Sequence, residues 1–210
     1  SSDCPTLTRS MVAENSPYYL SGTRVVFTSD NKKHEAGMHV LNGWQRIGWD
    51  PAISKPSIGA HYKYNFNANL SLMYGAFYGS VYPDSLSINR LYQHINLLWK
   101  QGNWETWGTF DLGLESGYSW FAAQVMNRYT FNSHWSLSQR VELFYDPNNR
   151  CARVGANQET IIGGFTLCPT YQVSERIALR LDTKLLQATE NILKGESWDL
   201  QFNAGIGVKF

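Results

Sequence analysis

The sequence has no long apolar run, because no stretch of 18 or more apolar residues occurs among its 210 residues. A transmembrane helix needs about 20 such residues, so helical membrane spans are excluded. If the chain lies in a bilayer, it must cross it with the strands of a β-barrel, the other structure that satisfies its backbone internally.

Charge of either sign is also scarce. Lys and Arg (18) balance Asp and Glu (17), so the formal net charge is +1, and only 17% of residues are charged. A chain so close to neutral has no field for holding a polyanion, which argues against nucleic-acid binding. The opening residues lack the pattern of a signal peptide, so we expect either a mature chain or one that needs no export.

Cysteine occurs only at Cys4, Cys151 and Cys168. These positions lie far apart and show no CxxC or Cys-His spacing, so we expect no metal site and no cofactor. At most one internal disulfide can form. A bridge between Cys151 and Cys168 is possible, but the sequence does not decide the pairing.

What the chain has instead is alternation of apolar and polar residues. Residues 198–210 alternate over their whole length, with Leu200, Phe202 and Ile206 on one face and Asp199 and Gln201 on the other. Strands of soluble proteins usually run five or six residues, whereas a tilted membrane crossing needs about nine to eleven. The length of this strand therefore favours a membrane barrel.

The same pattern recurs along the chain and predicts eleven strands. They lie at about 18–29, 34–43, 56–67, 69–80, 88–100, 103–115, 118–131, 136–146, 158–172, 177–184 and 198–210. Bacterial barrels normally have an even strand number, and residues 5–14 could supply a twelfth strand. We therefore predict one all-β domain over residues 1–210, a transmembrane antiparallel up-and-down β-barrel of about 12 strands (10 to 12).

The predicted connections alternate between short and long, as a barrel with tight periplasmic turns and longer outer loops requires. Aromatic residues such as Trp99, Trp104, Trp135 and Tyr171 gather where strands meet the short turns. Indole and phenol rings prefer the headgroup level of a membrane, so these residues indicate an interfacial girdle.

Several segments carry a family resemblance. They are SPYYLSGTRVVF, then GMHVLNGWQRI with the NGW motif at 42–44, then SLSQRVELFYDPNN with Arg140, Glu142 and Asp146, and later GGFTLCPTYQVSERIALRLDTKLL. From about residue 6 to 210 the chain resembles a family of outer-membrane β-barrel porins of Gram-negative bacteria. The resemblance implies a channel in the bacterial outer membrane. The C-terminal GIGVKF is similar to the signal read by the barrel assembly machinery, which makes Phe210 the expected contact with that partner.

Strand parity assigns most charged residues to the lumen, where nine basic residues face eight acidic ones. This near balance predicts no strong preference for anions or cations. The expected pore-lining residues are Arg24, His39, His61, Lys63, Arg90, His94, Asp111, Arg128, Arg140, Glu142, Asp146, Arg180, Asp182 and Lys184. Their charges could set a field across a water-filled pore, or could form ion pairs that fill a narrow barrel.

Enzymatic activity is not expected. The string HVLNG is only faintly similar to the site of an outer-membrane phospholipase, and Leu41 stands where its nucleophile would be. His39 and Asp50 could lie at the rim as in a barrel protease, but no paired acids accompany them. We therefore predict no catalytic residue.

Two functions remain open at this stage. The first is passive diffusion of small hydrophilic solutes and ions through the barrel, with outer-membrane lipid and lipopolysaccharide as surroundings. The second is a closed structural or surface-binding barrel, suggested by Trp44, Trp49, Tyr82 and the loop at 147–159, in which the loops contact a partner.

Overall fold

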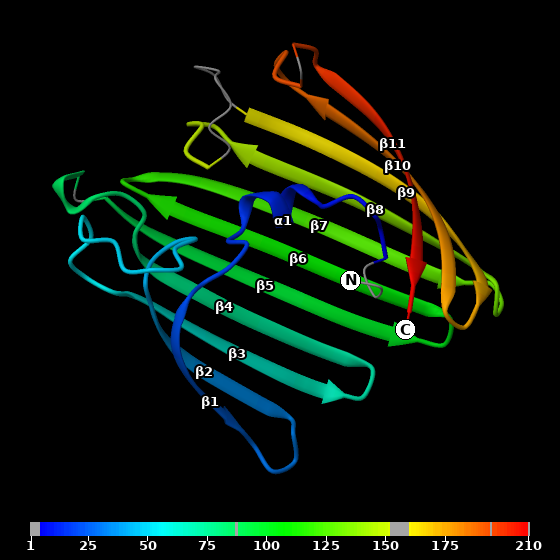
Figure 1. Cartoon of the computed structure of the whole chain (residues 1–210), viewed down its shortest axis with the longest axis horizontal. Coiled ribbons are helices and arrows are strands. Elements are labelled where there is room, and N and C mark those ends of the chain that lie inside the picture. The colour runs from blue at the N-terminus through cyan, green and yellow to red at the C-terminus, as the bar shows by residue number, and fades with distance from the viewer. Residues whose placement is uncertain (1–4, 87, 152–159, 194, 210) are drawn as a thin grey trace.

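The structure is a computed structural model that describes residues 5–86, 88–151, 160–193 and 195–209. Its strands form one antiparallel sheet whose order follows the chain, as the ribbon in Figure 1 shows. The strands are β1 Gly22–Thr28, β2 His34–Leu41, β3 Ser57–Asn67, β4 Leu70–Ser80, β5 Asn89–Gln101, β6 Trp104–Glu115, β7 Tyr118–Thr130, β8 Trp135–Asp146, β9 Thr160–Ser174, β10 Ile177–Ala188 and β11 Trp198–Val208. The all-β, antiparallel up-and-down fold predicted from the alternation is thus confirmed.

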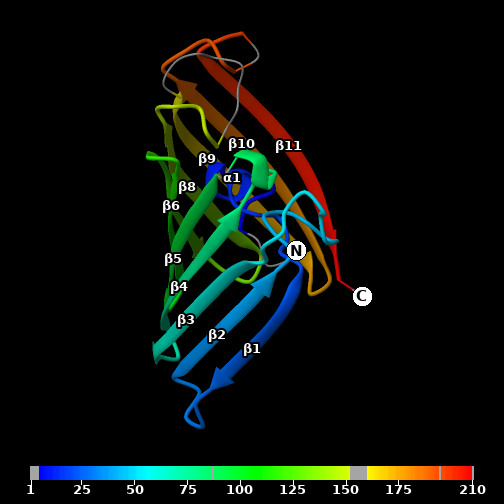
Figure 2. The same ribbon diagram turned by 90° about the vertical axis from the view of Figure 1, so that its left-hand side faces the viewer.

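The sheet curves into a trough, with β1 and β11 as its two edges (Figure 2). Among the described residues, no ladder joins these two strands. Because the sheet has eleven strands and every pairing is antiparallel, β1 and β11 run in the same direction. An antiparallel closure would therefore need a further strand between them.

The twelfth strand predicted at residues 5–14 is wrong. This segment lies inside the curve of the sheet and contains the short helix α1, Met11–Asn15, with Ser10 as its N-cap (Figure 2). The Ser10 hydroxyl accepts a hydrogen bond from Ala13 N at 3.1 Å, which satisfies a free amide of the first turn. The backbone before α1 bonds to charged side chains of the wall instead of to a strand, an alternative that periodicity does not reveal.

The two faces of the sheet have opposite chemistry. On β8, Val141 is 59% exposed on the outer face, while its neighbours Arg140 and Glu142 are 2% and 3% exposed on the inner face. On β10, Leu181 is 61% exposed and Asp182 only 1%. A water-soluble protein would bury the apolar set, so this arrangement is the one that suits hydrocarbon outside the sheet.

The connections alternate in length as predicted. Short turns at 29–33, 68–69, 102–103, 131–134 and 175–176 occupy one end of the sheet. The connections at the other end are 42–56, 81–88, 116–117, 147–159 and 189–197, and all of them except 116–117 are longer. The connection 81–88 contains the 3-10 helix η1 Asp84–Leu86, and residues 152–159 of the connection 147–159 lie outside the described part. Among the described residues, no helix is both long and apolar enough to cross a membrane.

Rings gather on the outer face at the short-turn end. Trp104 packs on Tyr129 with ring centroids 4.7 Å apart, and Trp135 packs on Tyr171 at 4.8 Å. This is the position predicted for the interfacial girdle.

Candidate functional site: the interior of the barrel

The N-terminal segment occupies the interior along β7 to β10. Arg140 of β8 is the centre of its attachment, because the guanidinium donates to Thr6 Oγ1 at 2.7 Å and to the Thr8 carbonyl at 2.9 Å. The same guanidinium donates to Thr166 Oγ1 at 3.0 Å and lies 3.3 Å from a Glu142 oxygen. Arg140 thus joins the segment to two strands of the wall.

Three further wall residues hold the segment. The Asp182 carboxylate accepts from Leu7 N at 2.9 Å and from the Thr8 hydroxyl at 2.9 Å. The other oxygen of Glu142 accepts from Met11 N at 2.5 Å. Lys184 donates to the Arg9 carbonyl at 2.9 Å and lies 3.5 Å from Glu142. Buried charges are tolerated when they are paired and hydrogen-bonded in this way.

An apolar cluster lies at the long-loop end of the interior. Trp44 from the loop after β2 turns inward between Phe77 and Tyr92, with ring centroids 5.2 and 5.1 Å apart. The Arg90 guanidinium lies 4.9 Å from the Trp44 ring centroid, and Val12 of α1 belongs to the same cluster. The NGW motif therefore places a tryptophan inside the barrel mouth, a role that the sequence did not predict.

A cavity of about 830 Å³ lies between the N-terminal segment and the wall formed by β1 to β6. Five of the predicted pore-lining residues lie on this cavity: Arg24, His39, His61, His94 and Asp111. Asn96, Thr109 and Gln124 add a polar belt, in which Thr109 donates to Asn96 at 2.9 Å and Gln124 donates to Thr109 at 3.4 Å. The cavity is therefore mainly polar on its β5 to β7 side.

Register explains how the histidines fit into this wall. One row across the sheet runs Gly37, His61, Gly75, His94 and Asp111, from β2 to β6. A Cβ at Gly37 would stand 2.3 Å from the His61 ring, and one at Gly75 would stand 2.2 Å from the His94 ring. The glycines thus leave room for each imidazole to lie over the neighbouring strand.

Two of the histidines are linked to each other, and one of these to a carboxylate. His39 Nε2 lies 2.8 Å from His61 Nδ1, and His61 Nε2 lies 3.3 Å from Glu35 Oε1. Next to His94, Asp111 accepts a hydrogen bond from the Tyr92 hydroxyl at 2.7 Å. Among the described residues, the second oxygen of Asp111 has no hydrogen-bond partner.

The other predicted pore-lining residues lie on the inner face but away from this cavity. Arg90 forms a buried ion pair with Glu115 at 2.7 Å, and Arg128 lies 3.7 Å from Glu105. Asp146 accepts from Arg150 N at 2.9 Å and Cys151 N at 2.6 Å, which secures the start of the following loop.

Two more of these residues, Lys63 and Arg180, are half-buried, opposite Glu35 and Gly205 respectively. Two separate groups of the predicted residues thus lie together in the interior. One group lies on the cavity, and the other, Arg140, Glu142, Asp182 and Lys184, lies beneath the N-terminal segment.

Cysteine and metal sites were also considered from the sequence. Cys151 and Cys168 are both free thiols, so the possible bridge between them is not formed, and Cys4 lies outside the described residues. Within the described part of the chain, no group of three or more His, Cys, Asp or Glu side chains is placed to hold a metal ion.

Solved structures with the same fold are outer-membrane channels. An anion-selective porin from Comamonas acidovorans has a TM-score of 0.63 at 12% identity, over 88% of this chain and 57% of that one. The outer membrane channel DcaP of Acinetobacter baumannii has a TM-score of 0.61 at 9% identity, over 88% and 60%. The chain thus spans under two thirds of the length of these porins, and identities this low show the fold alone.

No curated protein matches the chain. The family comparison is more decisive, because the profile described as "Putative beta-barrel porin-2, OmpL-like" matches residues 1–210. It agrees with the up-and-down sheet, the apolar outer face and the resemblance seen in the sequence. The chain belongs to this family of β-barrel porins.

Proposed function

We propose that the protein is a porin-like, non-enzymatic channel of the bacterial outer membrane, through which small hydrophilic solutes and ions diffuse passively. The observation that carries this proposal is the cavity left open between the N-terminal segment and the wall of β1 to β6, which is polar on its β5 to β7 side. Its polar belt of Asn96, Thr109 and Gln124 can exchange hydrogen bonds with water or a passing solute.

In this proposal the solute passes along Arg24, His39, His61, His94 and Asp111. The charged wall beneath the N-terminal segment fills space and holds that segment. The outer face contacts lipid and lipopolysaccharide. The C-terminal strand is recognised by the barrel assembly machinery through Phe210, which lies outside the described residues. Channel activity and membrane location both rest on membership of the porin family together with the two-faced sheet.

Accessibility of engineered cysteines tests the proposed path. In a variant without the three native cysteines, Thr109→Cys places a thiol on the cavity, while Thr106→Cys on the same strand faces outward. A charged, membrane-impermeant thiosulfonate reagent should reduce the planar-bilayer current of the Thr109 variant and spare the Thr106 variant. Absence of ohmic current steps and of liposome swelling with small sugars would refute the channel itself.

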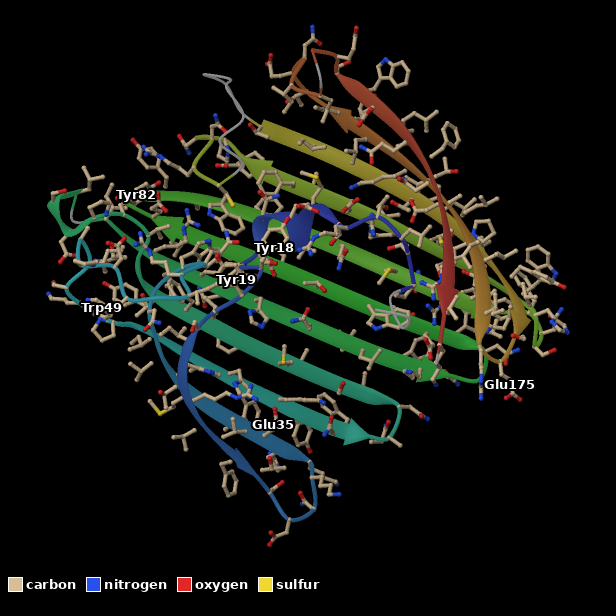
Figure 3. The ribbon with its side chains drawn as sticks, viewed as in Figure 1. Tyr18, Tyr19, Glu35, Trp49, Tyr82 and Glu175 are labelled. Carbon is tan, nitrogen blue, oxygen red and sulfur yellow. The ribbon has the colours of Figure 1, made fainter. Side chains whose placement is uncertain are left out.

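The alternative is a closed barrel whose loops bind a partner. Of the three aromatic residues that suggested it, Trp44 is buried and Tyr82 donates to the buried Glu115 at 3.1 Å. Only Trp49 is well exposed, at the loop end of the sheet (Figure 3). This pattern favours the channel, since anchors for a partner must be accessible.

A further inference from the structure

The basic side chains of the interior differ in whether an acid neutralises them. Arg90 pairs with Glu115, while Arg140 and Lys184 share Glu142. Arg24 of β1 is exposed on the cavity, and among the described residues no carboxylate lies within ion-pair distance (4.0 Å) of it. Among the described residues that line the cavity, Arg24 is the one Lys or Arg side chain, and it has no acidic partner.

The nearest carboxylate along the neighbouring strand is already engaged. Glu35 of β2 lies opposite Thr28, four residues along β1 from Arg24, and its Oε1 is 3.3 Å from His61 Nε2. His61 is in turn hydrogen-bonded to His39, which stands directly opposite Arg24. Glu35 is thus engaged by His61, and the guanidinium of Arg24 can accept an anion from outside as its partner.

The surroundings of Arg24 are not uniformly polar. Leu41 and Phe77 line the same cavity from the wall, and Leu20 lines it from the stretch between α1 and β1. Phe77 lies in the same row of the sheet as Arg24 and His39, separated from them by Gly59. Sites for small organic ligands commonly combine apolar walls with a few charged groups that fix orientation.

We propose that this part of the cavity is a binding subsite for a small organic anion, with Arg24 holding its carboxylate and Leu20, Leu41 and Phe77 packing against its apolar body. The planar guanidinium matches a carboxylate in geometry as well as charge. The inference deepens the proposed function by naming a class of solute that the channel would recognise, and its physiological meaning rests on that function.

Calorimetry on the refolded protein in detergent micelles tests this with benzoate as the probe. Benzamide, which has the same shape without the charge, reports binding through the ring alone. We expect benzoate to bind more tightly than benzamide, and Arg24→Gln to weaken benzoate binding about tenfold, the effect of losing a charge-assisted contact. Arg128→Gln is the matched control, because Arg128 is also an inner-face arginine but lies off the cavity.

Equal affinity for benzoate and benzamide, or equal affinity of the Arg24 and Arg128 variants, would overturn the proposal. Arg24→Lys keeps the charge but loses the planar guanidinium, so its affinity for benzoate should lie between those of the unaltered protein and Arg24→Gln. If Arg24→Gln fails to fold, an Arg24→Lys affinity equal to that of the unaltered protein would overturn the role of the guanidinium. The channel is tested separately from the subsite. If the protein conducts but does not prefer benzoate, the proposed function is retained and the subsite is rejected. Binding through Arg24 without conductance would keep the subsite and reject the channel.

Discussion

The two halves of the inner wall use similar residues for different purposes. Along β7 to β10, charged side chains are buried and paired, and they bind the backbone of the N-terminal segment. Along β1 to β6, Arg24, the histidines and Asp111 lie around a cavity. The difference shows that an inward-facing charge is not by itself evidence of a pore, since the same parity serves packing in one half and an open space in the other.

The largest expected effect comes from reversing one arginine in each half. Arg140→Glu would leave two buried carboxylates, at 140 and 142, side by side on β8 and would remove the hydrogen bonds of the guanidinium to Thr6 and Thr8. Breaking a buried charge pair costs about 3–5 kcal/mol, whereas Arg24→Glu on the open wall should cost under about 1 kcal/mol. Urea unfolding in lipid vesicles measures both. Equal costs would mean that the two halves do not differ.

On the outer face, a new charge should destabilise the two halves of the sheet to the same extent. Val141→Arg on β8 and Ile95→Arg on β5 both place a charge on an exposed apolar surface near the middle of a strand. Each should cost about 2–4 kcal/mol if that surface meets hydrocarbon. Vesicle unfolding of each arginine variant, against Val141→Leu and Ile95→Leu as controls, measures the cost. Harmless arginines would indicate water on this face.

Smaller effects are expected from adding a side chain at the glycines that lie beside the histidine rings of the open half. Gly75→Val would push into the His94 ring and should cost about 1–3 kcal/mol, with a reduced single-channel current. Gly108→Val on β6 is the control, because a Cβ there would meet only Leu97 at 3.7 Å. A Gly75 variant with unchanged stability and current would show that the histidine row tolerates rearrangement.

The smallest effect concerns a contact between the loops 42–56 and 81–88, which follow β2 and β4 of the open half. The Ser54 amide donates to Asp84 at 2.8 Å, and hydrogen bonds from Ser54 hold the pKa of the Asp84 carboxyl below its ordinary value of 3.8. Because a lowered pKa favours the ionised form in the folded protein, the contact should persist from neutral pH to pH 3.8 and be lost as pH falls further. Carboxyl NMR titration checks this, and Ser54→Ala should raise the pKa.

Much of the fold could be predicted because the information is local. Eleven strands were expected from alternation, and most of their ends lie within two residues of those observed. The conformation of residues 5–14 could not be predicted from alternation, because their backbone partners, such as Glu142 and Asp182, lie far away in the chain. The inward position of Trp44 could not be predicted for the same reason, since its partners Phe77 and Tyr92 belong to two other strands.

The sequence by itself determined which side chains face inward, because a strand has a period of two and each register leaves only one apolar face. It also determined the antiparallel order, since short turns join neighbouring strands. Only the tertiary structure decided which inward charges are covered by the N-terminal segment and which line a cavity. That choice depends on contacts between residues more than a hundred positions apart, such as Arg140 with Thr6, and no local pattern encodes them.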